Sequence, residues 1–139
     1  MLILGCQIFS IFKTEQLILE TGGRGWWSDA LTAFARQVGD RANLRVVSLD
    51  WGFNEQLAFL TDKPDLREPF WDLLAGKDVK APRSASCIYL VHPPEYTLFP
   101  FASSFLSDAQ QAAPGSVDIL AWRDRQGRIA FYSVRFREQ

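Results

Sequence analysis

The pattern of apolar and polar positions divides the middle of the chain into a helix followed by a buried strand. Between residues 29 and 38 apolar side chains recur at the spacing of one helix face, and Gly39 follows where the helix would end. Ser28 is a favourable N-cap for this helix. Residues 44–49 are almost continuously apolar, as are residues 87–91. Runs of this kind indicate strands that are covered on both faces of a sheet.

The segment between the two apolar runs predicts helical connections. Asn54 opens a short apolar-periodic stretch and is expected to cap a helix, and residues 68–74 predict one or two further helical turns. Residues 77–86 are polar, contain a proline and are expected to form a loop. Because strands joined through helices run parallel within one sheet, residues 44–49 and 87–91 should be parallel neighbours.

The carboxyl-terminal third predicts a helix and an antiparallel hairpin. Ser103 or Ser104 is expected to cap a helix that runs to residue 113. Residues 117–122 and 129–136 have strand character on either side of residues 124–127, a turn with a glycine available for the left-handed position. The whole pattern predicts the α/β class: a small open sheet with parallel central strands, flanking helices and a carboxyl-terminal antiparallel hairpin.

The first residues form a separate apolar segment. Residues 1–12 are mostly apolar and are followed by Lys13, a run too short to cross a bilayer alone because a span needs about 20 apolar residues. Two interpretations stay open: a helix start that is buried or packed on a partner, and the end of a transmembrane helix. We therefore divide the chain into an apolar amino-terminal segment, residues 1–13, and a single α/β domain, residues 14–139.

Composition narrows the classes of partner and chemistry. The 139 residues include 15 basic and 16 acidic side chains, a formal charge of -1, so we expect no nucleic-acid partner. Two cysteines and one histidine cannot supply a four-ligand zinc site, and no metal or cofactor is expected. Aromatic residues make up 14% of the chain, which indicates either a dense core or a surface resting on another body.

Polar and aromatic residues follow each of the two buried strands. Asp50 and Trp51 come after the first strand, and His92 comes after the second. Carboxyl ends of parallel strands share one sheet edge, where ligands bind in open α/β sheets. An acid beside the only histidine suits general acid–base chemistry, although capping of the following helix by Asp50 is the more common role. The candidate binding residues at this edge are Asp50, Trp51, Asn54, His92 and Tyr96.

A glycine-rich segment precedes the first predicted domain helix. Residues 22–25 consist of three glycines and Arg24, and two tryptophans follow them. The spacing matches neither the Walker nor the dinucleotide-binding motif, which argues against a phosphate loop. We expect a bend between helices, or backbone donors for a surface anion with Arg24 assisting. Arg24 is therefore a further candidate binding residue. The tryptophans would suit a packed hinge, a sugar or a membrane interface.

Three of these segments together resemble a known family. They are residues 21–30 (TGGRGWWSDA), 47–57 (VSLDWGFNEQL) and 89–100 (YLVHPPEYTLFP), and residues 124–134 (DRQGRIAFYSV) fit the same pattern. The chain resembles the soluble carboxyl-terminal domain of bacterial polytopic glycosyltransferases, the group akin to dolichyl-phosphate-mannose protein mannosyltransferases. The resemblance covers most of residues 14–136.

This resemblance implies a role beside a membrane enzyme. Enzymes of this group take a sugar from a polyprenyl-phosphate donor, and their catalytic acid lies in an early loop between membrane helices, so this chain would hold no catalytic residue. Residues 1–12 would then be the end of the last membrane helix. The domain would lie on the extracytoplasmic face of the bacterial membrane. Its partners would be the membrane portion of the enzyme or the membrane surface, with a glycan or lipid-linked sugar as a further ligand.

Two other functions stay open on the sequence alone. The first is a free-standing small α/β enzyme, cytoplasmic, that uses Asp50 and His92 on a phosphate or sugar ester. The second is an interaction module whose aromatic surface docks a partner protein. The first requires the two side chains to meet in a concave, accessible site.

Overall fold

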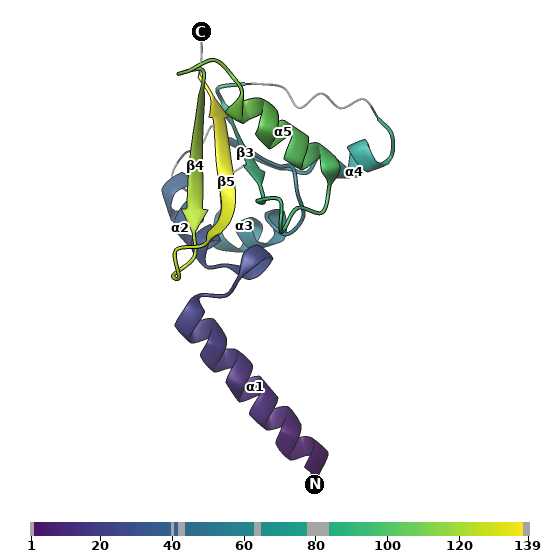
Figure 1. The fold of residues 1–139 in the computed structure, drawn as a ribbon, viewed down its shortest axis with the longest axis vertical. Helices are drawn as coiled ribbons and strands as arrows, with labels where there is room; N and C mark the ends of the chain where they lie inside the picture. Colours follow the sequence, from purple (N-terminus) through teal and green to yellow (C-terminus); the bar gives the residue numbers. More distant parts are fainter. Residues whose placement is uncertain (1, 40, 42–43, 63–64, 78–83, 138–139) are drawn as a thin grey trace.

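The computed structural model describes residues 2–39, 41, 44–62, 65–77 and 84–137, which are organised around one five-stranded mixed sheet (Figure 1). Its strands are β1 (Arg45–Ser48), β2 (Asp65–Arg67), β3 (Cys87–Val91), β4 (Val117–Arg123) and β5 (Ile129–Phe136). The spatial order is β2-β1-β3-β5-β4. β1 runs parallel to β2 and β3, whereas β5 is antiparallel to both β3 and β4. The predicted fold class is therefore confirmed.

Helices cover both faces of this sheet (Figure 1). α2 (Ala30–Val38) and α3 (Asn54–Leu60) pack on one face, and α5 (Pro100–Gln110) packs on the other. The short α4 (Phe70–Leu74) lies beside the start of α5, where the Phe70 and Phe99 rings stack 5.0 Å apart. The two remaining elements, α1 (Leu2–Thr21) and the 3₁₀ turn η1 (Gly25–Trp27), precede α2.

The central strands form two hydrophobic clusters because their side chains alternate between the two faces. Val46 and Leu90 point to the face covered by α2, where they meet Phe34 of that helix. Val47 and Tyr89 point to the opposite face, under α5. All five β3 residues are buried, as the continuous apolar run predicts for a strand covered on both sides.

Several predicted boundaries are wrong for local reasons. Residues 65–67 were expected to lie in a connection but form the edge strand β2; three residues, two of them charged, give too weak a strand pattern. α5 begins at Pro100, ahead of the predicted serine caps, since proline fits the first helical turn, and it ends at Gln110. The Ser104 hydroxyl instead donates to Pro100 O within the helix. Most of the predicted loop at 77–86 lies outside the described residues.

The start of α2 also differs by one residue from the prediction. Asp29 occupies the N-cap position, and the Ser28 hydroxyl accepts a hydrogen bond from the Ala30 amide at 3.2 Å. Gly39 ends the helix as predicted, although its φ of -57° is an ordinary right-handed value. The end of this helix therefore does not depend on the conformational freedom of glycine.

α1 is a continuous helix that projects away from the sheet and its covering helices (Figure 1). It runs through the division between the two predicted segments, residues 1–13 and 14–139. Apart from the half-buried Gln16, its side chains from residue 5 to residue 20 are exposed, so the segment is not buried against the rest of this chain. Among the described residues, no helix combines the length and apolar character needed to cross a membrane.

Candidate functional site

The candidate site lies at the carboxyl edge of the parallel strands. β1 and β3 are in register as parallel neighbours, so the residues that follow them emerge on one edge. The loop after β1 holds Asp50 and Trp51, and the loop after β3 holds His92 and Tyr96. The connector between α1 and α2 packs against both loops. The edge predicted from the sequence is thus built from three segments, one of which was not expected there.

Asp50 is fully buried and ties the two loops together. Its Oδ1 accepts hydrogen bonds from the backbone N–H groups of Trp51 (3.0 Å) and Leu98 (3.2 Å). Its Oδ2 is buried and has no hydrogen-bond partner among the described residues. Burial raises the pKa of Asp50 above its ordinary 3.8, against the opposing effect of the two backbone amides. Neither amide belongs to α3, so the expected capping of that helix by Asp50 is wrong.

His92 is held in place by backbone groups and a stacked ring. It is 2% exposed, with Nδ1 3.0 Å from Ala130 O and Nε2 3.3 Å from Trp51 O. The Phe53 ring stacks on the imidazole at 4.3 Å between centroids, nearly parallel at 16°. Loss of hydration lowers the pKa of His92 below its ordinary 6.5. Both nitrogens face protein carbonyls, which leaves neither of them free for a substrate.

Asn54 has a different role from the predicted one. Phe53 holds the N-cap position of α3, and Asn54 is the first residue of the helix. The Asn54 side chain accepts a 2.6 Å hydrogen bond from the hydroxyl of Ser48, the last residue of β1. Asn54 therefore joins the end of the strand to the start of the helix and helps to fix the turn that contains Asp50.

Trp26 joins the connector to both loops. Its indole N–H donates to Tyr96 O at 2.7 Å, and its own carbonyl accepts from the Gln56 amide at 2.8 Å. The same Gln56 amide donates to Gly52 O at 2.7 Å. The Trp26 ring meets Trp51 edge to face, with centroids 6.2 Å apart. Trp26 and Gln56 are site residues that sequence reasoning missed, although the Trp-Trp pair beside glycines was the available signal for the first.

The accessible part of the edge is aromatic and basic. Trp27 is 65% exposed and lies edge to face against the half-buried Trp51, with centroids 6.3 Å apart. Arg24 Nε donates to the Tyr96 hydroxyl at 2.9 Å, and this bond raises the pKa of Arg24 further. Gly25 has a φ of +56°, and a Cβ there would lie 3.1 Å from the Tyr96 ring. Glycine at this position therefore allows the connector to approach the tyrosine closely.

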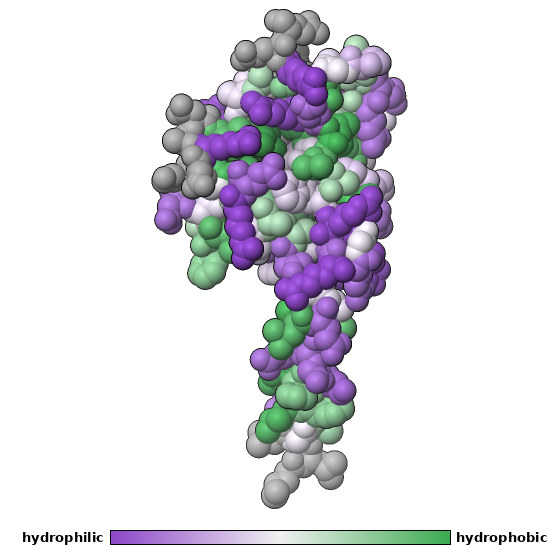
Figure 2. Space-filling view, turned by 90° about the vertical axis from the view of Figure 1, so that its left-hand side faces the viewer, coloured by the Kyte–Doolittle hydropathy of each residue, from purple (hydrophilic) through white to green (hydrophobic). Residues whose placement is uncertain are grey.

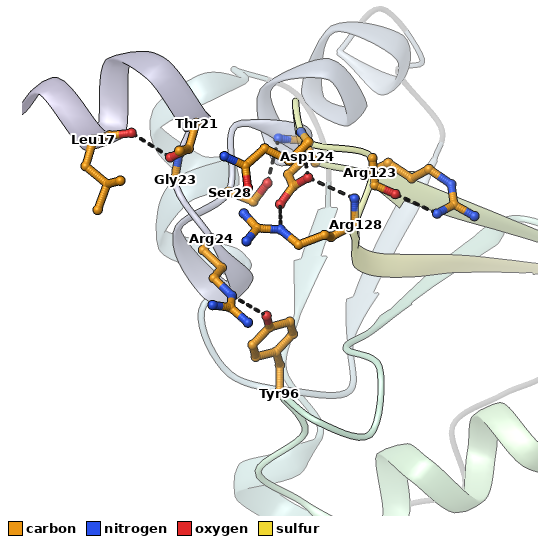
Figure 3. A network of polar contacts seen from close by, with 12 residues as sticks. Leu17, Thr21, Gly23, Arg24, Ser28, Tyr96, Arg123, Asp124 and Arg128 are labelled. Carbon is orange, nitrogen blue, oxygen red and sulfur yellow. Dashed lines mark hydrogen bonds and ion pairs between the residues drawn. The ribbon is translucent and has the colours of Figure 1, made fainter.

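Polar contacts also hold the end of α1 and the β4–β5 turn near this surface (Figure 3). Asp124 accepts from the backbone amides of Gln126 and Arg128 and from Arg128 Nε (2.7 Å). Burial alone would raise the pKa of Asp124, but the Arg128 side chain and these amides outweigh it and lower the pKa. Gly127, with a φ of +77°, provides the left-handed position that the hairpin prediction required. The predicted turn is confirmed.

The structure thus brings together all six predicted site residues but divides them by exposure. Asp50 and His92 are buried, where they hold the two loops in place. Among the described residues, no cluster of His, Cys, Asp and Glu side chains could bind a metal ion. Trp51 and Tyr96 are half-buried, Arg24 is exposed, and Asn54 is bound to Ser48. The geometry offers an aromatic and basic surface for binding, supported from below by a buried polar layer.

The buried imidazole gives the first testable expectation. We expect His92, the only histidine in the chain, to titrate below 6.5, because burial disfavours the imidazolium form. The single imidazole resonance, followed by NMR over a pH series, reports this midpoint directly. A midpoint at or above 6.5 would show that the ring is solvated or paired with an ionised Asp50.

The same lowering predicts the direction of the pH dependence of stability. Above pH 6.5 the contribution of His92 to the free energy of unfolding is fully present, and it is lost as the pH falls through the folded pKa. Asp50 acts in the opposite sense: its contribution is present below 3.8 and is lost as the pH rises through its raised pKa. Urea unfolding at about pH 7.5 and about pH 5.5 should therefore show a larger acid loss for the wild type than for His92→Gln.

No family model matches the chain, and neither a curated protein nor a solved structure is significantly similar to it. The functional interpretation therefore depends on the geometry of the carboxyl edge and on the sequence resemblance. Within that geometry three segments far apart in sequence, residues 21–30, 47–57 and 89–100, are in direct contact. They form one structural unit at the sheet edge, whose accessible side chains are aromatic and basic.

Proposed function

We propose that this chain is a non-catalytic accessory domain of a bacterial membrane glycosyltransferase that uses a lipid-linked sugar donor. In this role it lies on the extracytoplasmic face and positions a glycan through Trp27, Trp51 and Arg24. One observation supports this above all others. The three segments, far apart in sequence, converge on one edge of the sheet, where the exposed Trp27 indole packs on Trp51 and the exposed Arg24 guanidinium binds the Tyr96 hydroxyl.

The chemistry of this surface suits a sugar. Indole faces stack on the apolar faces of pyranose rings, while an arginine supplies hydrogen bonds to hydroxyl groups or to a phosphate. Arg24 is exposed and uses Nε for the Tyr96 hydroxyl, and among the described residues its terminal nitrogens make no further hydrogen bond. Trp51 and Tyr96 hold Trp27 and Arg24 in place, so ordering these side chains on binding costs less entropy.

The burial of Asp50 and His92 favours this role over the enzyme alternative. The acid is fully buried, and the imidazole nitrogens face two backbone carbonyls. A general acid or base has to reach the proton it transfers, directly or through one water molecule. These two residues instead hold the loops that present the aromatic surface.

Titration with methyl α-mannoside tests the proposal without any membrane. We expect the indole N–H signals of Trp27 and Trp51 to shift, because they line the surface, while those of Trp71 and Trp122 stay in place. Trp27→Ala should weaken the interaction about tenfold, the effect of losing roughly 1.4 kcal/mol of ring contact.

Trp71→Ala is the matched control, since Trp71 is similarly exposed at 58% but lies on α4. Equal effects of the two variants would contradict the proposal. The absence of any indole shift at about 50 mM mannoside would contradict it too, because a dissociation constant near 50 mM corresponds to a binding free energy of only about 2 kcal/mol.

A docking role for a protein partner is the second candidate, and one observation favours it. Phe59 on α3 is 89% exposed, and Leu60 beside it is also exposed. Exposed apolar groups of this size mark interaction surfaces when they are contiguous. A co-purifying membrane protein whose retention is lost in Phe59→Ser but kept in Trp27→Ala would support this second role.

A further inference from the structure

α1 has an apolar half and a polar half. At about 100° per residue, six of the seven large apolar side chains that are exposed among the described residues of α1 fall within roughly half of the helix circumference, while the seventh, Leu17, lies on the other half beside Ser10. The polar residues Gln7, Ser10 and Thr14 lie on the opposite half, and Figure 2 shows apolar and polar residues side by side along this helix. The apolar residues are Ile8, Phe9, Ile11, Phe12, Ile18 and Leu19, each between 54% and 68% exposed.

One charged side chain of α1, Lys13, lies where an interfacial helix tolerates a charge. Lys13 lies at the border between the two halves, with its ammonium group 5.8 Å from the centroid of the Phe9 ring. Long basic side chains at such a border keep their charge in water while the stem covers apolar surface. Glu15 is the exception, since it falls inside the apolar half and lines a shallow hollow together with Ile11 and Ile18.

The end of α1 is fastened to the domain by an arginine. Arg125, in the β4–β5 turn, donates to Leu19 O at 2.8 Å and to Asp29 Oδ2 at 2.6 Å. A guanidinium at a helix carboxyl terminus satisfies free carbonyls and matches the helix dipole. The apolar half of α1 therefore ends directly beside the arginines of the turn and the connector.

Those arginines place positive charge at the base of α1. Four arginines lie in the connector or at the β4–β5 turn, and three carboxylates lie in the same region. The arginines are Arg24, Arg123, Arg125 and Arg128, and the carboxylates are Glu20, Asp29 and Asp124. These seven groups sum to +1, whereas the eleven basic and thirteen acidic residues elsewhere sum to -2. Arg125 and Arg128 pair with carboxylates. Among the described residues, the hydrogen bonds of Arg24 and Arg123 go to uncharged oxygens, the Tyr96 hydroxyl and Gly127 O, although the charge of Asp124 also acts on Arg24.

We infer that α1 lies on an anionic lipid bilayer, with its apolar half in the interface and the arginines at its base against lipid phosphates. This inference rests on the proposed function, in which the domain lies at a membrane. An anionic bilayer is the partner that offers both an apolar plane for the helix and phosphates for Arg24 and Arg123. The exposed Trp27, in the same connector as Arg24, adds an indole of the kind that favours the headgroup layer.

Vesicle sedimentation of the full chain tests this inference. We expect binding to phosphatidylcholine vesicles that contain phosphatidylglycerol to be at least tenfold stronger than binding to phosphatidylcholine alone. The difference should largely disappear between about 50 mM and about 500 mM salt, because screening removes the phosphate contacts. The double variant Arg24→Gln with Arg123→Gln should weaken binding about 25-fold, from roughly fivefold for each arginine near the surface.

Matched variants separate the charge from the apolar half. Arg135→Gln with Arg137→Gln removes the same charge at the other end of the hairpin and should leave binding unchanged. Phe9→Gln with Phe12→Gln should abolish binding to every vesicle, whereas Ser10→Gln with Thr14→Gln, on the polar half, should not.

The outcomes distinguish this inference from the proposed function. Equal binding to neutral and anionic vesicles, or equal losses from the two arginine pairs, overturns the anionic-lipid inference while membrane docking survives. If neither vesicle binds, the membrane placement fails as well, and the mannoside titration then judges the sugar surface alone. A concentration-dependent dimer that is lost in Phe9→Gln with Phe12→Gln would assign the apolar half to a second copy and also overturn the inference.

Discussion

Phe53→Ala should lower the free energy of unfolding by about 3–5 kcal/mol, the cost of deleting a fully buried aromatic ring. Phe53 is 1% exposed, stacks on His92 and meets Phe131 edge to face at 5.4 Å. Its removal leaves a cavity against the imidazole, so water can reach the His92 nitrogens. The variant should therefore also move the His92 titration midpoint upward toward 6.5.

Phe59→Ala is the internal control for this prediction. Phe59 lies on the adjoining helix α3 but is 89% exposed, so the same deletion removes little buried area. We expect a change within about 0.5 kcal/mol. Urea unfolding followed by far-UV circular dichroism measures both variants. A loss below about 1 kcal/mol for Phe53→Ala would mean that the layer around His92 is not packed as described.

The sheet shows which features of the fold a sequence can predict. Continuous apolar runs at β1 and β3 and the glycine in the β4–β5 turn were sufficient for the sheet, because they follow from local patterns. β2 was missed since its short, charged segment becomes a strand only by pairing with β1. Tertiary contact determines such edges, and local propensity does not.

The candidate site shows the same division. The rule that parallel strands present their carboxyl ends on one edge was enough to gather Asp50, Trp51, His92 and Tyr96. It could not show that both nitrogens of His92 face carbonyl oxygens, because Ala130 lies 38 residues away and supplies only a backbone atom. Backbone acceptors have no sequence signature. The structure was therefore needed to show that Asp50 and His92, which the sequence offered as general acid–base candidates, instead hold the loops in place.

Gly23, in the connector between α1 and α2, gives the second large expected effect. Gly23 has a φ of +82°, and a Cβ there would lie 2.0 Å from Trp27 O, a backbone atom that cannot rotate away. Gly23→Ala should therefore cost about 1–2 kcal/mol for the left-handed conformation and a further 1–3 kcal/mol for the displaced connector. Movement of Trp27 also separates it from Trp51, so mannoside binding should weaken in the same variant.

Gly115→Ala is the matched control, because it carries the conformational cost without the clash. Gly115 has nearly the same φ, +83°, with no atom within 4 Å of the added Cβ, so only the left-handed penalty applies. If the two variants unfold at the same urea concentration and both keep the wild-type indole spectrum, the connector does not pack on the Trp27 carbonyl. A larger loss for Gly23→Ala, accompanied by shifted Trp26 and Trp27 indole signals, would show that the connector builds the surface. In that case the glycines act by allowing two tryptophans and an arginine to close over the sheet edge, and no phosphate need be bound.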